Sequence, residues 1–321
     1  MITNLLLGAA GLLCLSSCSQ KEEPKISPSK AAPLAVEAVA EFSGDKAFAH
    51  VKALTDFGPR PPESDAYRQS LAYLEAELGK LGWKTQRQSF KAVTPIGPIN
   101  FTNLLARYSP DSEPDWQSSV DFIIGSHLDT KRYLDKVFVG ANDSGSSTGV
   151  LVELARVLSR HGKAAKSIEL VFFDGEEALL ENIHGRDGLY GSKYYAGQLN
   201  NRSNKPKLGM VLDIVGDINL PLLVGSDTHP NLKTHTHAAA KILGISDKVQ
   251  AYERTIIDDH VPLMTQANLP VLHLIGDFNI ATYWHKEGDT LDKISPKALE
   301  NTGKLTLQVL HQITALHSSL K

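Results

Sequence analysis

Residues 168–177 read IELVFFDGEE, and this stretch decides the fold class. Its first part, Ile168–Phe173, is a nearly unbroken apolar run, as expected for a central strand that is covered on both faces of a sheet. Its second part, Asp174-Gly175-Glu176-Glu177, is a polar turn that follows the strand at once. In open α/β sheets the ligand site lies beyond the carboxyl ends of the strands. The stretch therefore predicts both a buried strand and the edge of the sheet where function lies.

The segments on either side alternate between helical and strand patterns. Apolar residues at helical spacing predict helices at 46–57, 66–81, 149–160, 190–198, 229–243 and 296–317. Alternating or continuous apolar runs predict further strands at 83–90, 101–108, 120–125, 210–215, 220–224 and 271–275. This alternation predicts an α/β fold, with a central twisted, mostly parallel (mixed) sheet flanked by helices on both faces. No internal repeat and no composition shift appears after residue 40, so we expect one domain over residues 41–321.

Composition excludes several classes of protein. The chain of 321 residues has 33 Lys+Arg and 36 Asp+Glu, a formal net charge of −3, so no positive excess is available to hold nucleic acid. Hydrophobic residues make up 42% and charged residues 21%, which is the balance of a folded chain. Two cysteines cannot build a disulfide framework or a four-thiolate zinc site. Any metal site must therefore use His, Asp and Glu.

The first residues are predicted to direct export. The apolar stretch Leu5–Leu15 is too short to span a bilayer, and Leu15-Ser16-Ser17-Cys18 resembles the bacterial lipobox. We expect a lipoprotein signal peptide at 1–17, lipidation of Cys18, and a disordered polar tether at 18–40. An ordinary signal peptide is the alternative, because positions 2–17 contain no Lys or Arg. The expected location is the cell envelope, facing the periplasm from the outer membrane in a Gram-negative host, with a lipid anchor as the sole membrane contact.

Several predicted strands run directly into carboxylates or imidazoles. The groups are His127 and Asp129, Asp143 before the helix at 149–160, Glu176 and Glu177, Asp213, and His285. A single Asp after a strand often caps the next helix, and for Asp143 alone this is the simpler interpretation. Like charges that converge at one edge of a sheet repel one another unless a cation lies among them. The group as a whole therefore predicts a metal site.

Imidazole nitrogen and carboxylate oxygen are ordinary zinc ligands. Neighbouring residues in extended backbone point to opposite sides, so one of Glu176 and Glu177 can bind a metal while the other acts as a general base. The alternative for this pair is a solvated acidic turn, which the preceding buried strand disfavours.

Asp258-Asp259-His260 forms a second polar group, and His273 lies within the apolar strand VLHLI. A helix N-terminus accounts for one of the two aspartates, but less well for both together with His260. His273 by itself fits a buried core histidine as well as a site residue.

These residues carry a family resemblance. Their order resembles the zinc-dependent exopeptidase superfamily of aminopeptidases, and within it the animal-type glutaminyl-peptide cyclotransferases, or glutaminyl cyclases. The matching stretches are VFVGANDS, LVFFDGEEA, DGLYGSKYYA, DDHVPL, LPVLHLI and YWHKEGDTLD, spread over roughly residues 57–294. DGEEA is shared with the aminopeptidases, whereas DDH followed by PVLHLI and WH is typical of the cyclases.

The resemblance implies a zinc-exopeptidase-like fold, one Zn²⁺ per chain and a role for each matching residue. Asp143, Glu177 and His285 would bind the zinc; Glu176, Asp213 and Asp258 would be catalytic; Trp284, His260 and His273 would contribute to substrate binding. His127 and Asp129 would support these residues or bind a second metal. The implied reaction closes an N-terminal Gln (possibly Glu) of a peptide to pyroglutamate with release of ammonia. We expect a monomer, since no apolar seam is evident on the predicted surface.

The chain also departs from the family pattern. Leu179-Leu180-Glu181-Asn182 lacks the aromatic residue that the animal enzymes carry near the pocket mouth, so the rim must be built differently. DTLDKIS, after His285, also resembles the aminopeptidases. A two-zinc aminopeptidase therefore stays an alternative, as does a lipid-anchored peptide-binding protein without activity.

Overall fold

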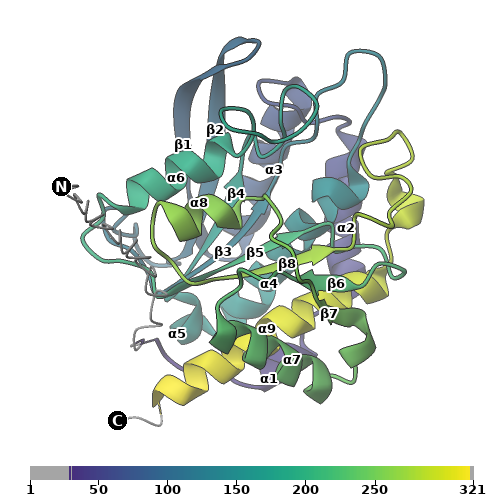
Figure 1. Cartoon of the computed structure of the whole chain (residues 1–321). Helices are drawn as coiled ribbons and strands as arrows, with labels where there is room; N and C mark the ends of the chain where they lie inside the picture. Colours follow the sequence, from purple (N-terminus) through teal and green to yellow (C-terminus); the bar gives the residue numbers. More distant parts are fainter. Residues whose placement is uncertain (1–28, 30, 319–321) are drawn as a thin grey trace, which may run out of the picture.

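The fold is built on one mixed sheet with helices on both faces (Figure 1). The computed structural model describes residue 29 and residues 31–318. In that part of the chain, eight strands pair in the order β1-β2-β4-β3-β5-β8-β6-β7. Their bounds are β1 Trp83–Thr94, β2 Gly97–Tyr108, β3 Phe122–His127, β4 Ile168–Phe173, β5 Leu208–Asp213, β6 Leu222–Val224, β7 Val249–Ala251 and β8 Val271–Gly276.

The four central strands, β4, β3, β5 and β8, run parallel, whereas β2 and β6 pair antiparallel on either side of them. All six residues of β4 are buried, as the apolar run predicts. Its one charged residue, Glu169, is buried together with Arg107 of β2, whose Nε lies 2.6 Å from Glu169 Oε2. The predicted α/β fold with a mixed central sheet is confirmed.

The helices agree with the predicted segments and include several short ones that periodicity missed. The bounds are α1 Glu37–Ala40, α2 Gly44–Asp56, α3 Asp65–Lys80, α4 Ser147–Arg160, α5 Gly162–Ala165, α6 Tyr190–Leu199, α7 Pro230–Ile242, α8 His260–Thr265 and α9 Pro296–Ser318. Single turns lie at η1 Ala141–Ser146, η2 Ser246–Lys248 and η3 Leu291–Lys293. Among the described residues, no helix is long and apolar enough to cross a membrane.

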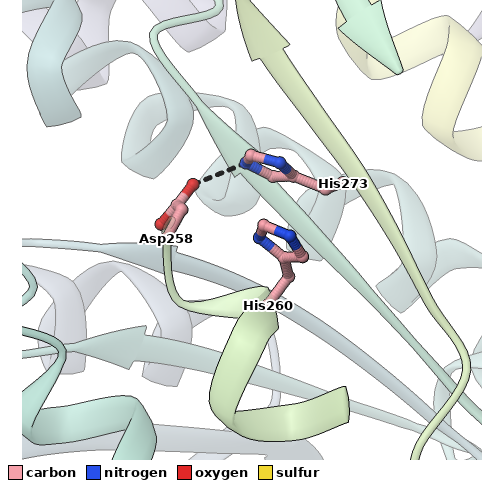
Figure 2. A group of neighbouring side chains, drawn as sticks. All are labelled: Asp258, His260 and His273. Carbon is pink, nitrogen blue, oxygen red and sulfur yellow. Dashed lines mark hydrogen bonds and ion pairs between the residues drawn. The ribbon is translucent and has the colours of Figure 1, made fainter. Parts of the chain in front are cut away.

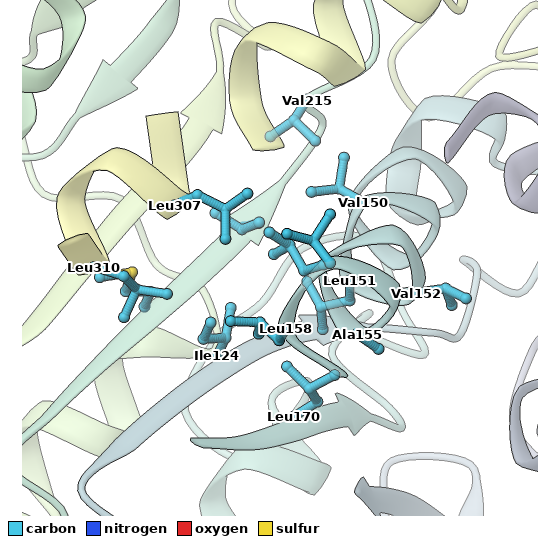
Figure 3. Close-up of a cluster of buried hydrophobic side chains, with 14 of the residues drawn as sticks. Ile124, Val150, Leu151, Val152, Ala155, Leu158, Leu170, Val215, Leu307 and Leu310 are labelled. Carbon is cyan, nitrogen blue, oxygen red and sulfur yellow. The ribbon is translucent and has the colours of Figure 1, made fainter. Parts of the chain in front are cut away.

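The two faces of the sheet are covered by different helices. Neighbouring strand residues point to opposite faces, so Ile124 and Leu170 pack with α4 and α9, whereas Ile123 and Val171 pack in a separate cluster with α6 and α8. Figure 3 shows the first cluster, to which Leu151 of α4 and Leu307 and Leu310 of α9 belong. Burial of one such leucine contributes roughly 1.5–3 kcal/mol. This double cover holds the central strands in register, and with them the side chains at their carboxyl ends.

The folded domain begins before residue 41, where the sequence analysis placed its boundary. Leu34 and Ala38 are buried in the main core, and the Leu34 amide donates to Thr314 Oγ1 of α9 at 2.9 Å. The polar composition that indicates a tether ends near residue 33, and the apolar residues that follow pack against α9. The predicted signal peptide and Cys18 lie outside the described residues.

Candidate active site and metal centre

A cavity of about 280 Å³ opens at the carboxyl ends of the central parallel strands. The acidic and imidazole groups of its floor are Asp143, Glu176, Glu177, Asp213, Asp258 and His285, and the buried Lys131 lines the cavity beside them. Each of these residues follows or ends a strand, or belongs to a loop that crosses the strand ends. The sheet therefore brings together at one edge residues that lie up to 142 positions apart in the chain, from 143 to 285.

Asp143, Glu177 and His285 face one another across a small gap. His285 Nε2 lies 3.4 Å from Asp143 Oδ2 and 3.2 Å from Glu177 Oε1, and one ligand-type atom from each residue lies within 4.8 Å of the others. Glu177 Oε1 is buried and has no hydrogen-bond partner among the described residues. A buried carboxylate oxygen that accepts no hydrogen bond lowers the stability of the fold, because its lost hydration is not replaced, unless a cation binds it. Two carboxylates and one imidazole form a donor set that suits zinc and leaves a position open.

Two buried aspartates fix the backbone that carries these carboxylates. Asp129 accepts hydrogen bonds from the Glu176 and Glu177 amides, at 3.1 and 3.3 Å. Gly175 turns the chain just before them at φ +70°, where an added Cβ would meet the Phe101 ring at 2.4 Å. The Asp129 carboxylate thus holds the main chain of Glu176 and Glu177, and Asp129 does not line the cavity.

Asp289 holds the main chain at Asp143 in the same way. Its two oxygens accept from the amides of Asn142 and Asp143, at 2.7 and 3.0 Å. Burial and the nearby Asp143 charge raise the pKa of Asp289 to about 7, against the effect of these amides. The DTLDKIS stretch, which begins with Asp289, resembles the aminopeptidases, but its sequence gives no sign of this contact.

Side chains of the loop at residues 131–136 hold the backbone of His285. The residue adopts a positive φ of 55°, which is uncommon for a non-glycine residue. Its main-chain oxygen accepts from Tyr133 Oη and Lys136 Nζ, both at 3.0 Å. A third residue of this loop, Lys131, is buried and donates to the Ala178 main-chain oxygen at 3.0 Å, with Glu177 Oε2 at 3.4 Å. These loop residues had no signal in the sequence pattern, because their partners lie far away in the chain and most of the contacts are to main-chain atoms.

A second donor group shares Asp143. His127 Nε2 lies 3.2 Å from both Asp143 Oδ1 and Asp213 Oδ1, and its Nδ1 lies 3.1 Å from the Asp129 main-chain oxygen. All three side chains are buried. Asp143 therefore stands between two possible metal positions, one with Glu177 and His285 and the other with His127 and Asp213.

Negative charge is concentrated on this floor. Burial raises the pKa of Glu176 well above its usual range, with His127 opposing and Asp258 and Glu177 adding to the rise. Burial likewise raises the pKa of Asp213 to about 7, against the effect of His127. The cause in both cases is the cost of a buried carboxylate among others, and a cation would relieve it. The raised pKa values and the arrangement of the donor atoms thus both indicate that this floor suits a metal ion.

Asp258, His260 and His273 form a second buried cluster, drawn in Figure 2. His273 Nε2 lies 2.5 Å from Asp258 Oδ2, which is a short hydrogen bond, and the ring of His260 stacks on that of His273 at 4.0 Å. His260 directs its own Nε2 to Asp227 Oδ2 at 3.2 Å. Two parallel stacked rings that face different carboxylates do not converge on one ion, although their donor atoms lie close together. We interpret this cluster as two hydrogen-bonded Asp–His pairs, joined by the stacked rings, of which the His273 pair orients Asp258.

The chain of contacts explains the charge of Asp258. Burial by itself would raise its pKa, but the hydrogen bond and charge of His273 lower the pKa of Asp258 to about 2. Asp258 lines the cavity, whereas His260 and His273 are buried behind it and are not among the lining residues. Of the three residues predicted to contribute to substrate binding, only Trp284 lines the cavity.

Trp284 belongs to an apolar wall above the polar floor. Its ring stacks on His285 with 4.1 Å between centroids, and Phe278 packs against it at 4.9 Å. Ile256 and Ile275 also line the cavity, and they belong to the hydrophobic cluster against which Phe278 and Trp284 pack. A substrate that reaches the polar floor must therefore pass between apolar side chains.

Comparison with known proteins gives one matching family and several similar proteins. The profile of peptidase family M28 matches residues 103–310. A glutaminyl-peptide cyclotransferase-like protein from Bos taurus is 28% identical over 287 residues, covering 80% of this chain and 73% of the bovine protein. The crystal structure of Porphyromonas gingivalis glutaminyl cyclase superimposes with a TM-score of 0.76 at 26% identity, covering 85% of this chain and 99% of that one.

The third comparison bears on the metal. The structure of a Zn-dependent exopeptidase from Parabacteroides distasonis matches with a TM-score of 0.75 at 25% identity, covering 85% of this chain and 99% of the other. The same fold thus occurs in proteins described as a glutaminyl cyclase and as a Zn-dependent exopeptidase.

Proposed function

The chain belongs to peptidase family M28, and we propose that within this family it is a zinc-dependent glutaminyl-peptide cyclotransferase. It would convert an N-terminal glutamine of a peptide to pyroglutamate and release ammonia. The observation that carries the proposal is the 2.5 Å contact between Asp258 and His273. These residues belong to the DDH and PVLHLI segments, which set the cyclase resemblance apart from the aminopeptidase one, and they place a charged carboxylate in the cavity. The cyclotransferase relatives, which cover most of the folded chain, support the same conclusion.

We assign the metal to Asp143, Glu177 and His285. Two observations support this assignment: Glu177 Oε1 accepts no hydrogen bond among the described residues, and the ring nitrogen of His285 lies within 3.4 Å of both carboxylates. Zinc bound there would polarise the side-chain amide of the substrate as a Lewis acid. Asp129 and Asp289 would keep the ligands in place through the main chain, as outer partners of metal ligands commonly do.

Glu176 is the proposed proton-transfer residue. The α-amine nitrogen of the substrate forms a bond to its own side-chain amide carbon, and the bond from that carbon to the amide nitrogen breaks. Glu176 takes one proton from the attacking nitrogen and returns it to the departing nitrogen, which leaves as ammonia. The buried, acidic surroundings that raise the pKa of Glu176 match this exchange, because the residue must hold and release a proton. The reaction consumes no water, so orientation of the amine is the main requirement.

Asp258 and Asp213 lie on the same floor and are proposed to act on the amide that breaks. Asp258, kept charged by His273, would accept a hydrogen bond from the amide N–H. Asp213, with a pKa raised to about 7, would exchange a proton with His127 or with the departing nitrogen.

A hydrolytic aminopeptidase is the alternative, and one observation speaks for it. His127, Asp143 and Asp213 form a second donor group that shares Asp143 with the first, so the residues for two metals are present. An exopeptidase among the structural matches agrees with this possibility. The segments that contain Asp258 and His273 favour the cyclase.

Measurement of zinc content and of product on one preparation separates the two. The cyclase proposal expects one tightly bound zinc and conversion of Gln-β-naphthylamide to its pyroglutamyl form with release of ammonia. Two tightly held zinc ions, with free amino acids released from peptides, would instead establish the aminopeptidase.

We also propose that the enzyme is an exported lipoprotein of the cell envelope, anchored through Cys18. The lipobox-like Leu15-Ser16-Ser17-Cys18 sequence supports this proposal. Incorporation of labelled palmitate into the full chain but not into the Cys18→Ala variant is the expected result. A wild-type chain without label would disprove the anchor.

A further inference from the structure

A second cavity lies at the β1 edge of the sheet, away from the catalytic one. It has a volume of about 260 Å³ and lies between β1, α6 with the turn that follows it, and the loop that precedes β3. It shares no lining residue with the catalytic cavity. Among the described residues that line it there is no carboxylate and no aliphatic side chain. Its chemistry therefore differs from the acidic floor and apolar wall of the catalytic cavity.

Half of the residues that line this edge cavity carry a carboxamide. They are Gln86, Gln88, Gln117, Gln198 and Asn201. Four of the ten glutamines in the chain thus gather at one place. Of the five side chains, only that of Gln88 binds another described residue, accepting a hydrogen bond from Asn103 Nδ2 at 2.9 Å. The other four amides each keep a donor and an acceptor available to a ligand.

A half-buried tryptophan, Trp116, forms part of the wall. The guanidinium carbon of Arg107 lies 5.1 Å from the centroid of its ring. Arg107 also donates to the main-chain oxygens of Asp115 and Ser118, at 2.7 and 2.8 Å. The loop is therefore held just before and just after the tryptophan.

A second half-buried ring, Tyr194 of α6, is fixed by the edge strand. It stacks on Phe90 of β1 with 4.2 Å between centroids and 5° between planes. The Ser203 amide, beyond α6, donates to the Gln117 main-chain oxygen at 3.0 Å and joins the loop to that turn. A cavity whose walls are ordered before a ligand arrives loses little conformational entropy on binding.

The charged side chains of this wall already face carboxylates. Arg87 pairs with Glu75 through Nε and Nη2, at 2.7 and 2.8 Å. Arg202 Nη1 lies 2.9 Å from Glu169 Oε1, a buried carboxylate that also pairs with Arg107. An anionic ligand would have to compete with these pairs, whereas an uncharged ligand adds hydrogen bonds to amides that are still free.

We propose that the edge cavity is a second, non-catalytic binding site that takes an uncharged sugar ring. A sugar presents hydroxyl groups, each of which donates and accepts, and apolar C–H faces on the same ring. The carboxamides match the hydroxyl groups, and the two aromatic rings match the C–H faces. An extended peptide along the β1 edge fits less well, because the wall offers no aliphatic pocket for its side chains.

The cavity is open to solvent, since Gln86, Gln117 and Asn201 are exposed. The ring can therefore belong to a free sugar or stand at the end of a glycan chain. Both sources present the same hydroxyl groups and ring faces to the walls, so the experiment needs an arm for each.

The first arm adds glucose, galactose, mannose or N-acetylglucosamine to the zinc-loaded full-length protein and detects binding by saturation-transfer NMR of the sugar. We expect at least one of the four to bind with a Kd of about 1 mM, the affinity that a small polar ligand of this size reaches. Glucuronate, which adds a carboxylate to the glucose ring, should bind more weakly than glucose.

The second arm uses the sugar that binds, immobilised on agarose. Retention of the protein, with release by the free sugar, would support a site for the end of a glycan chain. Binding of the free sugar without retention would support a site for free sugars.

Variants place the site. Trp116→Ala should weaken binding by about tenfold or more because it removes a ring contact, and Gln86→Ala/Gln198→Ala by about tenfold because it removes two amides. The control is Gln250→Ala, at an exposed glutamine of β7, the opposite edge strand of the sheet, and it should bind as wild type. Thermal unfolding shows that each variant is folded without reference to the catalytic reaction.

No binding of any of the four sugars, stronger binding of glucuronate than of glucose, or wild-type affinity in both cavity variants would overturn the inference. None of these results bears on the proposed function, because the two cavities share no lining residue.

Discussion

Two buried clusters of aspartate, glutamate and histidine lie along one cavity, and their geometry is opposite. In the first, Asp143, Glu177 and His285 face a common gap, and Glu177 Oε1 has no hydrogen-bond partner among the described residues. In the second, His273 and Asp258 already satisfy each other at 2.5 Å. The difference teaches that residue type does not decide between a metal site and a hydrogen-bonded support. What decides is whether the donor atoms face one another across a gap in the cavity, because the Nδ1 atoms of His260 and His273 in the second cluster also lack hydrogen-bond partners but do not line it.

The largest expected effect comes from removal of one histidine from each cluster. His285→Ala should lose both zinc and activity, because the metal then keeps only two carboxylates. His273→Ala should keep its zinc, but its free energy of unfolding should fall by roughly 1–3 kcal/mol because Asp258 loses a buried partner. Zinc content after dialysis and urea unfolding measure the two outcomes. Full zinc occupancy in His285→Ala would remove this residue from the ligand set.

Glu176 lines the same cavity but belongs to neither cluster. Its substitution tests whether Glu176 itself transfers the proton. Glu176→Gln should lower kcat by about 100-fold or more and leave the zinc content unchanged, since the amide keeps the shape but cannot accept the proton. Glu75→Gln, at a surface carboxylate paired with Arg87, is the matched control and should behave as wild type. Normal turnover in Glu176→Gln would show that another residue is the base.

Substitution of the aspartates that support each cluster, Asp289 and Asp227, should give a smaller difference in zinc affinity. Asp289→Ala removes the acceptor for the Asn142 and Asp143 amides and should weaken zinc binding by about 10- to 100-fold. Asp227→Ala acts on His260 in the second cluster and should leave zinc affinity within about twofold of wild type. Competition with a chelator measures both affinities. Equal losses in the two variants would mean that the clusters are not independent.

The smallest expected effect is a pH dependence of stability. The pKa of Asp258 is lowered to about 2 from the model-compound value of 3.8, so the folded state is stabilised by the charged carboxylate above about pH 4. That contribution is lost as the pH falls through the folded pKa. In metal-free protein, the difference in unfolding free energy between wild type and Asp258→Asn should therefore shrink from pH 4 to pH 2. A difference that stays constant over this range would show that Asp258 is not held in its charged form.

The sequence predicted the elements of the fold closely where the signal is local. The strand at 168–173 has the predicted bounds, and the long helices end within about two residues of their predicted ends. The short elements α1 and β7 were missed, because three or four residues carry too little periodicity and form through contacts with α9 and β6. The tether was predicted to extend to residue 40 because the main-chain contact that holds Leu34 is to Thr314 of α9, 280 residues later.

The sequence was also informative about which polar residues gather at the strand ends. Asp143, Glu177 and His285 could be named from the buried strand, its polar continuation and the family resemblance. The supporting contacts could not be named in this way. Asp289 acts on amides 146 and 147 residues away, and Tyr133 and Lys136 act on a main-chain oxygen. Nothing in their local sequence distinguishes them from surface residues.

The amino-acid sequence by itself determined the alternation of strands and helices and placed carboxylates and imidazoles at one edge of the sheet, because side-chain periodicity and strand ends are local properties of the chain. Only the tertiary structure decided which of those groups are satisfied and which are not. His273 and Asp258 pair, and Glu177 Oε1 remains without a hydrogen-bond partner, because the angles between loops far apart in the chain set the distances between these atoms.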